Sequence, residues 1–134
     1  MRVPQRVHNA VLLMADLAEP SRQEIFVSLT DIAERTAASR GFLEEIVVEL
    51  KDNGLVEAKR GAYGGYKLAR PADEISIGDI VTAVEGPLAL VDCLGGSACA
   101  AAGSCATKRI WSNVQRHLED ALYAISLADV ITGN

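Results

Sequence analysis

The chain has 134 residues, 49% hydrophobic and 4% aromatic, a length that suits one modest domain with an appended arm and excludes two enzymatic domains. Its formal charge of −5 comes wholly from residues 71–134, which carry three basic and eight acidic side chains against ten and ten in residues 1–70, so only the first half is suited to approach phosphates. No secretion signal and no membrane-length apolar run is present, so we expect a cytoplasmic protein that contacts no membrane.

Residues 8–19 predict the first helix, because their apolar side chains form a broad helical stripe that Pro20 ends. The stripe consists of Val11, Leu12, Met14, Ala15, Leu17 and Ala18. Ser28 is followed three residues later by Asp31, which is the pattern of a helix N-cap. A short second helix is therefore expected to begin after Ser28.

A third helix is predicted after a turn at residues 37–39, with Ser39 as its cap and Gly54 just past its end. Its apolar residues lie on one face: Leu43, Ile46, Val47 and Leu50. Two short helices joined by a tight turn make a helix-turn-helix, whose second helix reads DNA.

Residues 55–60 and 66–70 predict two strands of a hairpin around the glycine-rich turn at residues 61–65. Three glycines in five residues allow this turn to be tight and to lie close to another backbone. A hairpin directly after a recognition helix is the arrangement of a winged helix. The expected fold class is mainly α with a small β-hairpin.

The second half predicts a helix over residues 76–85, an irregular segment over 88–105 and a long amphipathic helix over about 106–125. Ser126 and Asp129 suggest the cap of one more short helix. We expect a winged-helix domain (1–87), a cysteine-bearing loop (88–105) and an arm (106–134). The apolar side of the long helix consists of Ile110, Trp111, Val114, Leu118, Leu122 and Ile125.

If residues 39–52 form the recognition helix, its first residues lie nearest the base edges: Ser39, Arg40, Gly41, Phe42, Glu44 and Glu45. Basic residues that could contact phosphates are Arg35, Lys51, Lys59, Arg60, Lys67 and Arg70. The recognition helix is itself acidic, however. The alternative is a winged helix that contacts proteins and whose charges are simply solvated.

Cys93, Cys99 and Cys105 are evenly spaced, with five residues between neighbours. Structural zinc sites usually pair cysteines two to four residues apart, which weakens a zinc interpretation. Three thiolates in a glycine-bearing loop can surround a larger group, and thiolates are the usual ligands of iron-sulfur clusters. The alternative is three free thiols or a redox pair.

A cluster normally needs a fourth ligand, and the chain has no fourth cysteine. Candidates with suitable chemistry are His8, His117, Asp92 and Glu85. No nucleophile-base pair, phosphate-binding loop or paired carboxylates indicate catalysis, so we expect neither an enzyme nor a small-molecule substrate.

Several segments together resemble the bacterial iron-sulfur regulator family typified by IscR and NsrR, over roughly residues 1–131. These are SLTDIAERTAAS, FLEEIVVEL, NGLVEAKRGAYGGYKLAR and DIVTAVEGPLALVDC, followed by the evenly spaced cysteines. The most specific signature is the wing RGxxGGYxLAR followed by EGPL and three cysteines.

The resemblance implies a homodimer with crossed C-terminal helices, in which each winged helix meets half of a palindromic operator and a labile 2Fe-2S or 4Fe-4S cluster modulates DNA affinity. Cys93, Cys99 and Cys105 match the family's cluster ligands. DNA-contacting positions are Thr30, Ser39, Arg40, Gly41, Phe42, Glu44 and Lys51, together with Lys59, Arg60, Gly61, Tyr63, Gly64 and Gly65 in and beside the wing.

One position departs from the pattern. IscR-type members place a histidine ligand three residues after the last cysteine, where this chain has Lys108. NsrR-type members instead use an acidic residue in the partner's first helix, and the matching position here is His8. Neutral imidazole is a competent iron ligand, so we rank His8, donated across the dimer, first.

We therefore expect a DNA-binding regulator, a repressor by class, controlled by a cluster that senses cluster supply, nitric oxide or redox state. Two alternatives remain open: a cluster-free regulator that works through thiol oxidation or a partner protein, and an interaction module that has lost DNA binding.

Overall fold

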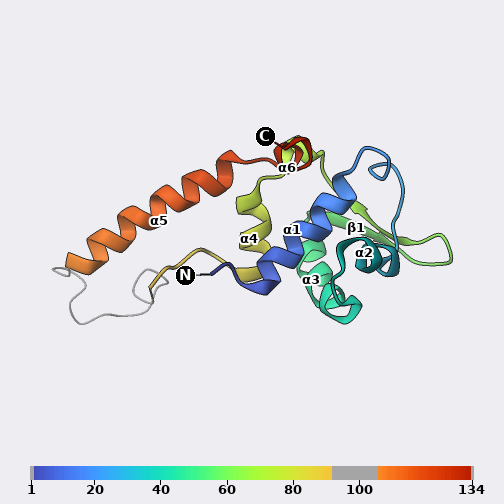
Figure 1. Ribbon diagram of the computed structural model, residues 1–134, viewed down its shortest axis with the longest axis horizontal. Coiled ribbons are helices and arrows are strands. Elements are labelled where there is room, and N and C mark those ends of the chain that lie inside the picture. Colours follow the sequence, from blue (N-terminus) through green and yellow to red (C-terminus); the bar gives the residue numbers. More distant parts are fainter. Residues whose placement is uncertain (1, 92–105, 134) are drawn as a thin grey trace.

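The computed structural model describes residues 2–91 and 106–133, and its mainly helical fold with one antiparallel hairpin confirms the expected class (Figure 1). The elements in chain order are α1 (Gln5–Ala18), α2 (Leu29–Thr36), α3 (Arg40–Asp52), β1 (Val56–Lys59), β2 (Gly65–Leu68), a 3-10 turn η1 (Ala72–Glu74), α4 (Ile77–Glu85), α5 (Ala106–Ala124) and α6 (Leu127–Thr132). None of the helices in the described ranges is both long enough and apolar enough to cross a membrane.

Serine caps begin four of the helices, as their sequences predict. The hydroxyls of Ser28 and Ser39 accept hydrogen bonds from the backbone N–H groups of Asp31 and Phe42, at 3.2 and 3.4 Å. Ser76 and Ser126 form complete capping boxes with the aspartates three residues on. Each cap satisfies backbone donors that a helix leaves unpaired, which fixes where the helix starts.

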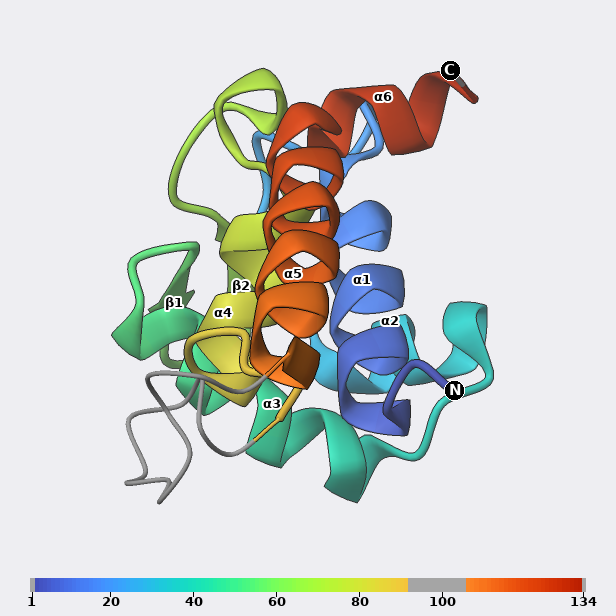
Figure 2. The same ribbon diagram turned by 90° about the vertical axis from the view of Figure 1, so that its left-hand side faces the viewer.

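Helix α1 begins three residues before the predicted 8–19 segment. Pro4 is its N-cap, and proline near a helix start removes only a donor that has no partner there. The side of α1 that the fold buries includes Ala10, Leu13, Met14 and Leu17, whereas Val11 is half-buried. The helix packs against α2, α3, α4 and α6, so it forms the centre of the core (Figure 2).

The wing is anchored by a third segment that the sequence does not reveal. Val27 pairs with Tyr66 of β2 through two backbone hydrogen bonds of 2.8 Å. Gly65 lies beside this pair with φ +144°, and a Cβ atom on it would lie 2.3 Å from the Val27 carbonyl oxygen. The expectation that a glycine of this turn approaches another backbone is thus confirmed, and that backbone is the Val27 segment of the same chain.

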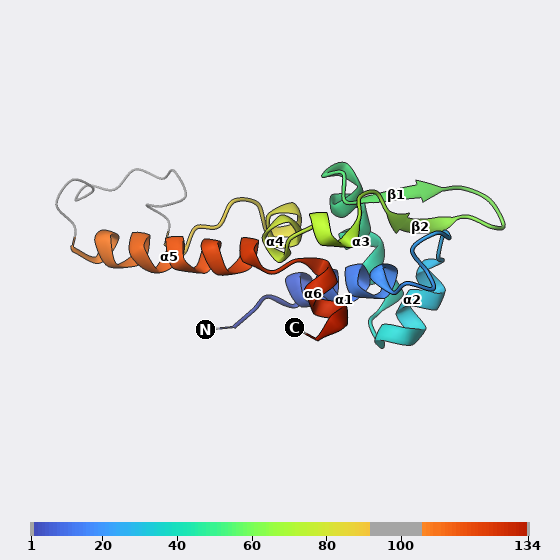
Figure 3. The same cartoon turned by 90° about the horizontal axis from the view of Figure 1, so that it is seen from above.

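Helix α5 extends away from the body, and the wing projects from the opposite end (Figures 1 and 3). The C-terminal end of α5 is attached to α4 through Tyr123. The Tyr123 ring packs where a side chain on Gly78 would lie, and its hydroxyl is 2.8 Å from Thr82 Oγ1. Gln115 Oε1 also accepts a hydrogen bond from the Leu90 N–H at 3.1 Å. No residue of α5 is buried.

Candidate nucleic-acid interface

The exposed N-terminal part of α3 is the centre of the candidate interface. Ser39, Arg40, Gly41 and Glu44 are all exposed, and Lys51 is exposed at the other end of the helix. The Ser39 hydroxyl already accepts the capping hydrogen bond from Phe42 N–H, so it contributes both to the helix start and to this surface. The structure therefore leaves these five predicted residues accessible to a ligand.

Phe42 is different, because its side chain is half-buried and packs against the hydrophobic core. Its ring holds the start of α3 on the body, so only part of this residue is accessible to DNA. Thr30, in the first turn of α2, is exposed. The helices α2 and α3 and the wing gather at the end of the molecule away from the start of α5 (Figure 3).

Two of the acidic residues on α3 have arginine partners, which reduces the electrostatic objection to DNA binding. Arg40 Nε lies 3.4 Å from Glu44 Oε1 one helical turn away. Arg6, in the first turn of α1, donates to Glu49, and this hydrogen bond raises the pKa of the Arg6 guanidinium. Because Glu49 is half-buried and paired, the negative charge directed outward by α3 is smaller than its sequence suggests.

The wing presents exposed basic and aromatic side chains near its turn. Lys59, Arg60 and Tyr63 are exposed, with Tyr63 90% accessible. The ammonium groups of Lys59 and Lys67 lie 5.7 and 4.8 Å from the centre of the Phe26 ring, which favours cation-π attraction. This contact links the base of the wing to the segment that precedes α2.

The glycines of the wing have roles inside the hairpin. Gly61 has φ +110°, which favours glycine at the turn. A Cβ atom on Gly64 would lie 2.1 Å from the Lys59 carbonyl oxygen. Together with Gly65, these residues shape the turn, whether or not they also approach DNA.

Arg35, which the sequence offers for phosphate contact, is instead held by Asp16. Its Nε and Nη2 atoms donate to the two Asp16 carboxylate oxygens at 2.8 and 2.9 Å, and this bidentate bond raises the pKa of the Arg35 guanidinium. Arg22 Nη2 also lies 3.3 Å from Asp16 Oδ1. Asp16 therefore joins α1 to the end of α2 and to the loop between them. A single acidic residue within the apolar stripe of residues 11–18 is the sequence signal that could have indicated a buried ion-pair partner.

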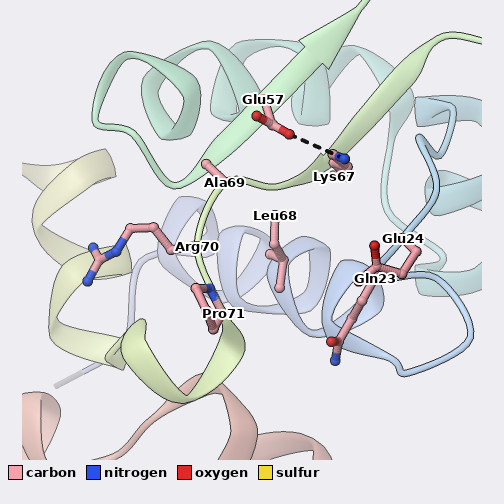
Figure 4. A pocket seen from close by; sticks show the side chains of 8 residues that line it. All are labelled: Gln23, Glu24, Glu57, Lys67, Leu68, Ala69, Arg70 and Pro71. Atoms are coloured by element: carbon pink, nitrogen blue, oxygen red, sulfur yellow. Dashed lines mark ion pairs between the residues drawn. The ribbon is translucent and has the colours of Figure 1, made fainter.

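Lys67 and Arg70 are likewise bound within the protein, at an open pocket of about 340 Å³ behind the wing (Figure 4). Lys67 Nζ lies 3.5 Å from Glu57 Oε1, and Arg70 Nη2 donates to the Glu74 carbonyl oxygen at 2.5 Å. Glu24 adds a second carboxylate to the pocket, so positive and negative side chains balance there. Among the predicted phosphate contacts, five are exposed and Lys67 is half-buried; Arg35 and Arg70 combine this exposure with the internal hydrogen bonds described above.

Cys93, Cys99 and Cys105 lie outside the described residues, as does Asp92. Within residues 2–91 and 106–133, no three histidine, cysteine or acidic side chains gather as metal ligands. His8 is exposed on α1, and Glu85 is exposed at the end of α4. His117 is exposed on α5, with its Nδ1 atom 2.8 Å from the Asn113 carbonyl oxygen of its own helix.

A helix-turn-helix followed directly by a hairpin, with its reading helix and wing exposed, defines a winged-helix DNA-binding regulator. The profile of the Rrf2 family, described as "Iron-dependent Transcriptional regulator", matches residues 3–133. The chain belongs to the Rrf2 family.

Its relatives support this assignment. The transcriptional regulator IscR of Serratia proteamaculans is 36% identical over 131 residues, which cover 98% of this chain and 79% of the relative. Among solved structures, T. potens IscR has a TM-score of 0.80 at 36% identity, covering 99% of this chain and 88% of that one. CymR of B. subtilis, called the global cysteine regulator, has a TM-score of 0.82 at 29% identity, covering 100% and 98%. The chain is thus a DNA-binding transcription regulator and not an enzyme.

Proposed function

We propose that the chain acts as a homodimer on a palindromic operator and that an iron-sulfur cluster controls its DNA affinity. The observation that carries the proposal is α5, a 19-residue helix with no buried residue. On the side that includes Ile110, 57% exposed, and Val114, 41% exposed, it carries an apolar stripe. A helix of this kind is stable when its apolar stripe packs against a partner, and an identical helix is the simplest one.

The stripe defines the dimer interface of the proposal: Ile110, Trp111, Val114, Leu118, Leu122 and Ile125. Residues 1–87 form the DNA-reading domain, residues 88–105 the cluster segment and residues 106–134 the dimer arm. The cysteines therefore occupy the connection between α4, the last helix of the reading domain, and α5. Binding of a cluster at this connection is suited to change the orientation of each reading domain relative to the arm. The dimer would then have two geometries, and the cluster would shift the balance between them.

On the operator, α3 lies in the major groove and the wing lies in the neighbouring minor groove. The reading positions of α3 are Ser39, Arg40, Gly41, Phe42 and Glu44, supported at phosphates by Thr30 and Lys51. The wing contributes Lys59, Arg60, Gly61, Tyr63, Gly64 and Gly65. These phosphate contacts set the position of the protein, whereas contacts to base edges specify sequence.

The donor set fits an iron-sulfur cluster. Cys93, Cys99 and Cys105 supply three thiolates, and His8 supplies an imidazole, a combination compatible with a 2Fe-2S or a 4Fe-4S cluster. When bound, the cluster supplies a redox-active group whose integrity depends on iron supply and on oxidants. The assignment of His8 as a ligand is supported by its exposure on α1, where a second subunit can reach it.

His8→Ala is expected to leave a cluster that is lost faster than that of the wild type and has a changed visible spectrum, because one ligand of four is removed. The measurement is visible absorption during air exposure of anaerobically reconstituted protein. Cys99→Ala, which removes a thiolate, serves as the reference for a broken site, and His117→Ala is the matched histidine control. Spectra and lifetimes of His8→Ala equal to those of His117→Ala would remove His8 from the ligand set.

A second candidate function is favoured by the likeness to CymR, since one solved relative is the oxidised form of Staphylococcus aureus CymR, at 31% identity and a TM-score of 0.74. In this case the three thiols themselves would be the sensor, through oxidation to a disulfide or sulfenic acid. Iron and sulfide analysis of anaerobically purified protein separates the two: stoichiometric iron and sulfide support the cluster, and their absence together with reversible thiol oxidation supports the thiol sensor.

A further inference from the structure

Val48 is an exposed apolar side chain on a helix that buries its other aliphatic residues. It is 54% accessible, whereas Leu43, Ile46, Val47 and Leu50 are at most 1% accessible. It makes no contribution to the core, and it is β-branched, which is not favoured in an exposed helix position. Folding of the single chain therefore does not explain why an apolar side chain is found at this position.

Val48 lies near the centre of the exposed side of α3. Successive residues of a helix are about 100° apart, so Val48 lies within about 20° of Gly41, two turns earlier. By the same geometry Glu44 and Glu45 lie on either side of this line, and both are exposed. The surface thus has an uncharged line, Gly41 to Val48, bordered by these carboxylates and, one turn beyond Val48, by the exposed Lys51.

Gly41 strengthens this interpretation, because the fold does not require glycine there. A Cβ atom at Gly41 would meet only the Ser39 hydroxyl, at 3.9 Å, and the residue has no left-handed backbone. Glycine inside a helix is less stable than alanine. A bare backbone on the same side of α3 as Val48 is therefore better explained by the close approach of another surface than by packing within the chain.

We propose that Val48 contacts the C5-methyl group of a thymine in the major groove and so helps to determine operator sequence. This methyl group is the apolar feature that the major-groove edges of the bases present. Glu44, which Arg40 partly neutralises, and Glu45 can accept hydrogen bonds from base amino groups, a contact that phosphates cannot offer. The inference rests on the proposed placement of α3 in the major groove.

The test replaces thymines by deoxyuridine, which removes only the methyl group. An operator is first selected from random duplex DNA with the full-length wild type, and each thymine is then replaced singly. We expect one position in each half-site where the replacement weakens wild-type binding about fourfold, the value for one buried methyl group. Val48→Ala should bind the two versions of that position equally. Val130→Ala changes an exposed valine on α6, which lies on the opposite side of the body from α3, and should retain the wild-type difference (Figure 2).

The outcomes separate this inference from the proposed function. Equal deoxyuridine effects in wild type and Val48→Ala at every thymine would overturn the Val48 contact while leaving operator binding intact. Failure of the wild type to select any sequence would overturn the operator itself, and the contact with it. Because Val48 is exposed, thermal unfolding of Val48→Ala is expected to match that of the wild type, which excludes misfolding as the cause.

Discussion

Replacing Asp16 by asparagine is expected to lower the free energy of unfolding by about 2–3 kcal/mol, because two guanidinium groups lose a buried anionic partner. The Asp16 side chain is only 5% accessible, and it holds Arg35 at 2.8 and 2.9 Å and Arg22 at 3.3 Å. Asparagine has the same shape, but its single side-chain oxygen replaces only one of the two carboxylate oxygens that accept from Arg35 Nε and Nη2. Since Arg35 lies in the last turn of α2, the helix that packs against α3, the substitution should also loosen the helix-turn-helix.

The measurement is denaturant unfolding followed by circular dichroism. Glu44→Gln is the matched control, since it makes the same acid-to-amide change in the exposed Arg40–Glu44 pair, where a loss below about 1 kcal/mol is expected. Equal losses in the two variants would mean that the burial of Asp16 adds nothing to its ion pairs, contrary to this account.

Replacing Val114 by glutamate is expected to convert the proposed dimer to monomers and to weaken operator binding by at least about 100-fold. A charge in the middle of the apolar stripe cannot be solvated when two stripes pack together. Each separated monomer then holds a single half-site and loses the gain of bivalent binding. Because Val114 is 41% accessible in the single chain, the fold of the monomer should survive the change.

Sedimentation and gel-shift titration of Val114→Glu measure the two effects. Arg116→Glu introduces the same side chain on the opposite side of α5, at an exposed position, and should remain dimeric with nearly wild-type affinity. A Val114→Glu protein that sediments and binds as the wild type does would place the interface elsewhere.

The sequence predicts the local part of this fold well. Helix starts at Ser28, Ser39, Ser76 and Ser126 follow from residues within three positions of each cap, so short-range chemistry is sufficient to locate them. The same holds for the end of α3, where Gly54 has φ +74°.

Long-range partners are what the sequence does not reveal. Arg35 looks like any basic residue beside a helix-turn-helix, and its bond to Asp16, 19 residues earlier, follows only from the packing of α2 on α1. The Arg6–Glu49 pair and the Val27–Tyr66 bridge join residues 43 and 39 positions apart, with no local pattern that predicts them. Sequence alone therefore overstates the unpaired negative charge of α3, because it does not show the arginine partners of Glu44 and Glu49. It also does not show that Arg35, Lys67 and Arg70 have partners within the fold.

The central claim is that one dimer couples a cluster on the cysteine segment to operator binding. The most direct test compares the operator affinity of a single anaerobic wild-type preparation before and after its cluster is removed by a chelator. We expect a visible chromophore in the first sample and affinities that differ by about 5- to 150-fold, the usual range of coupling between two sites. A colourless reconstituted protein, or equal affinities with and without the cluster, would contradict the claim.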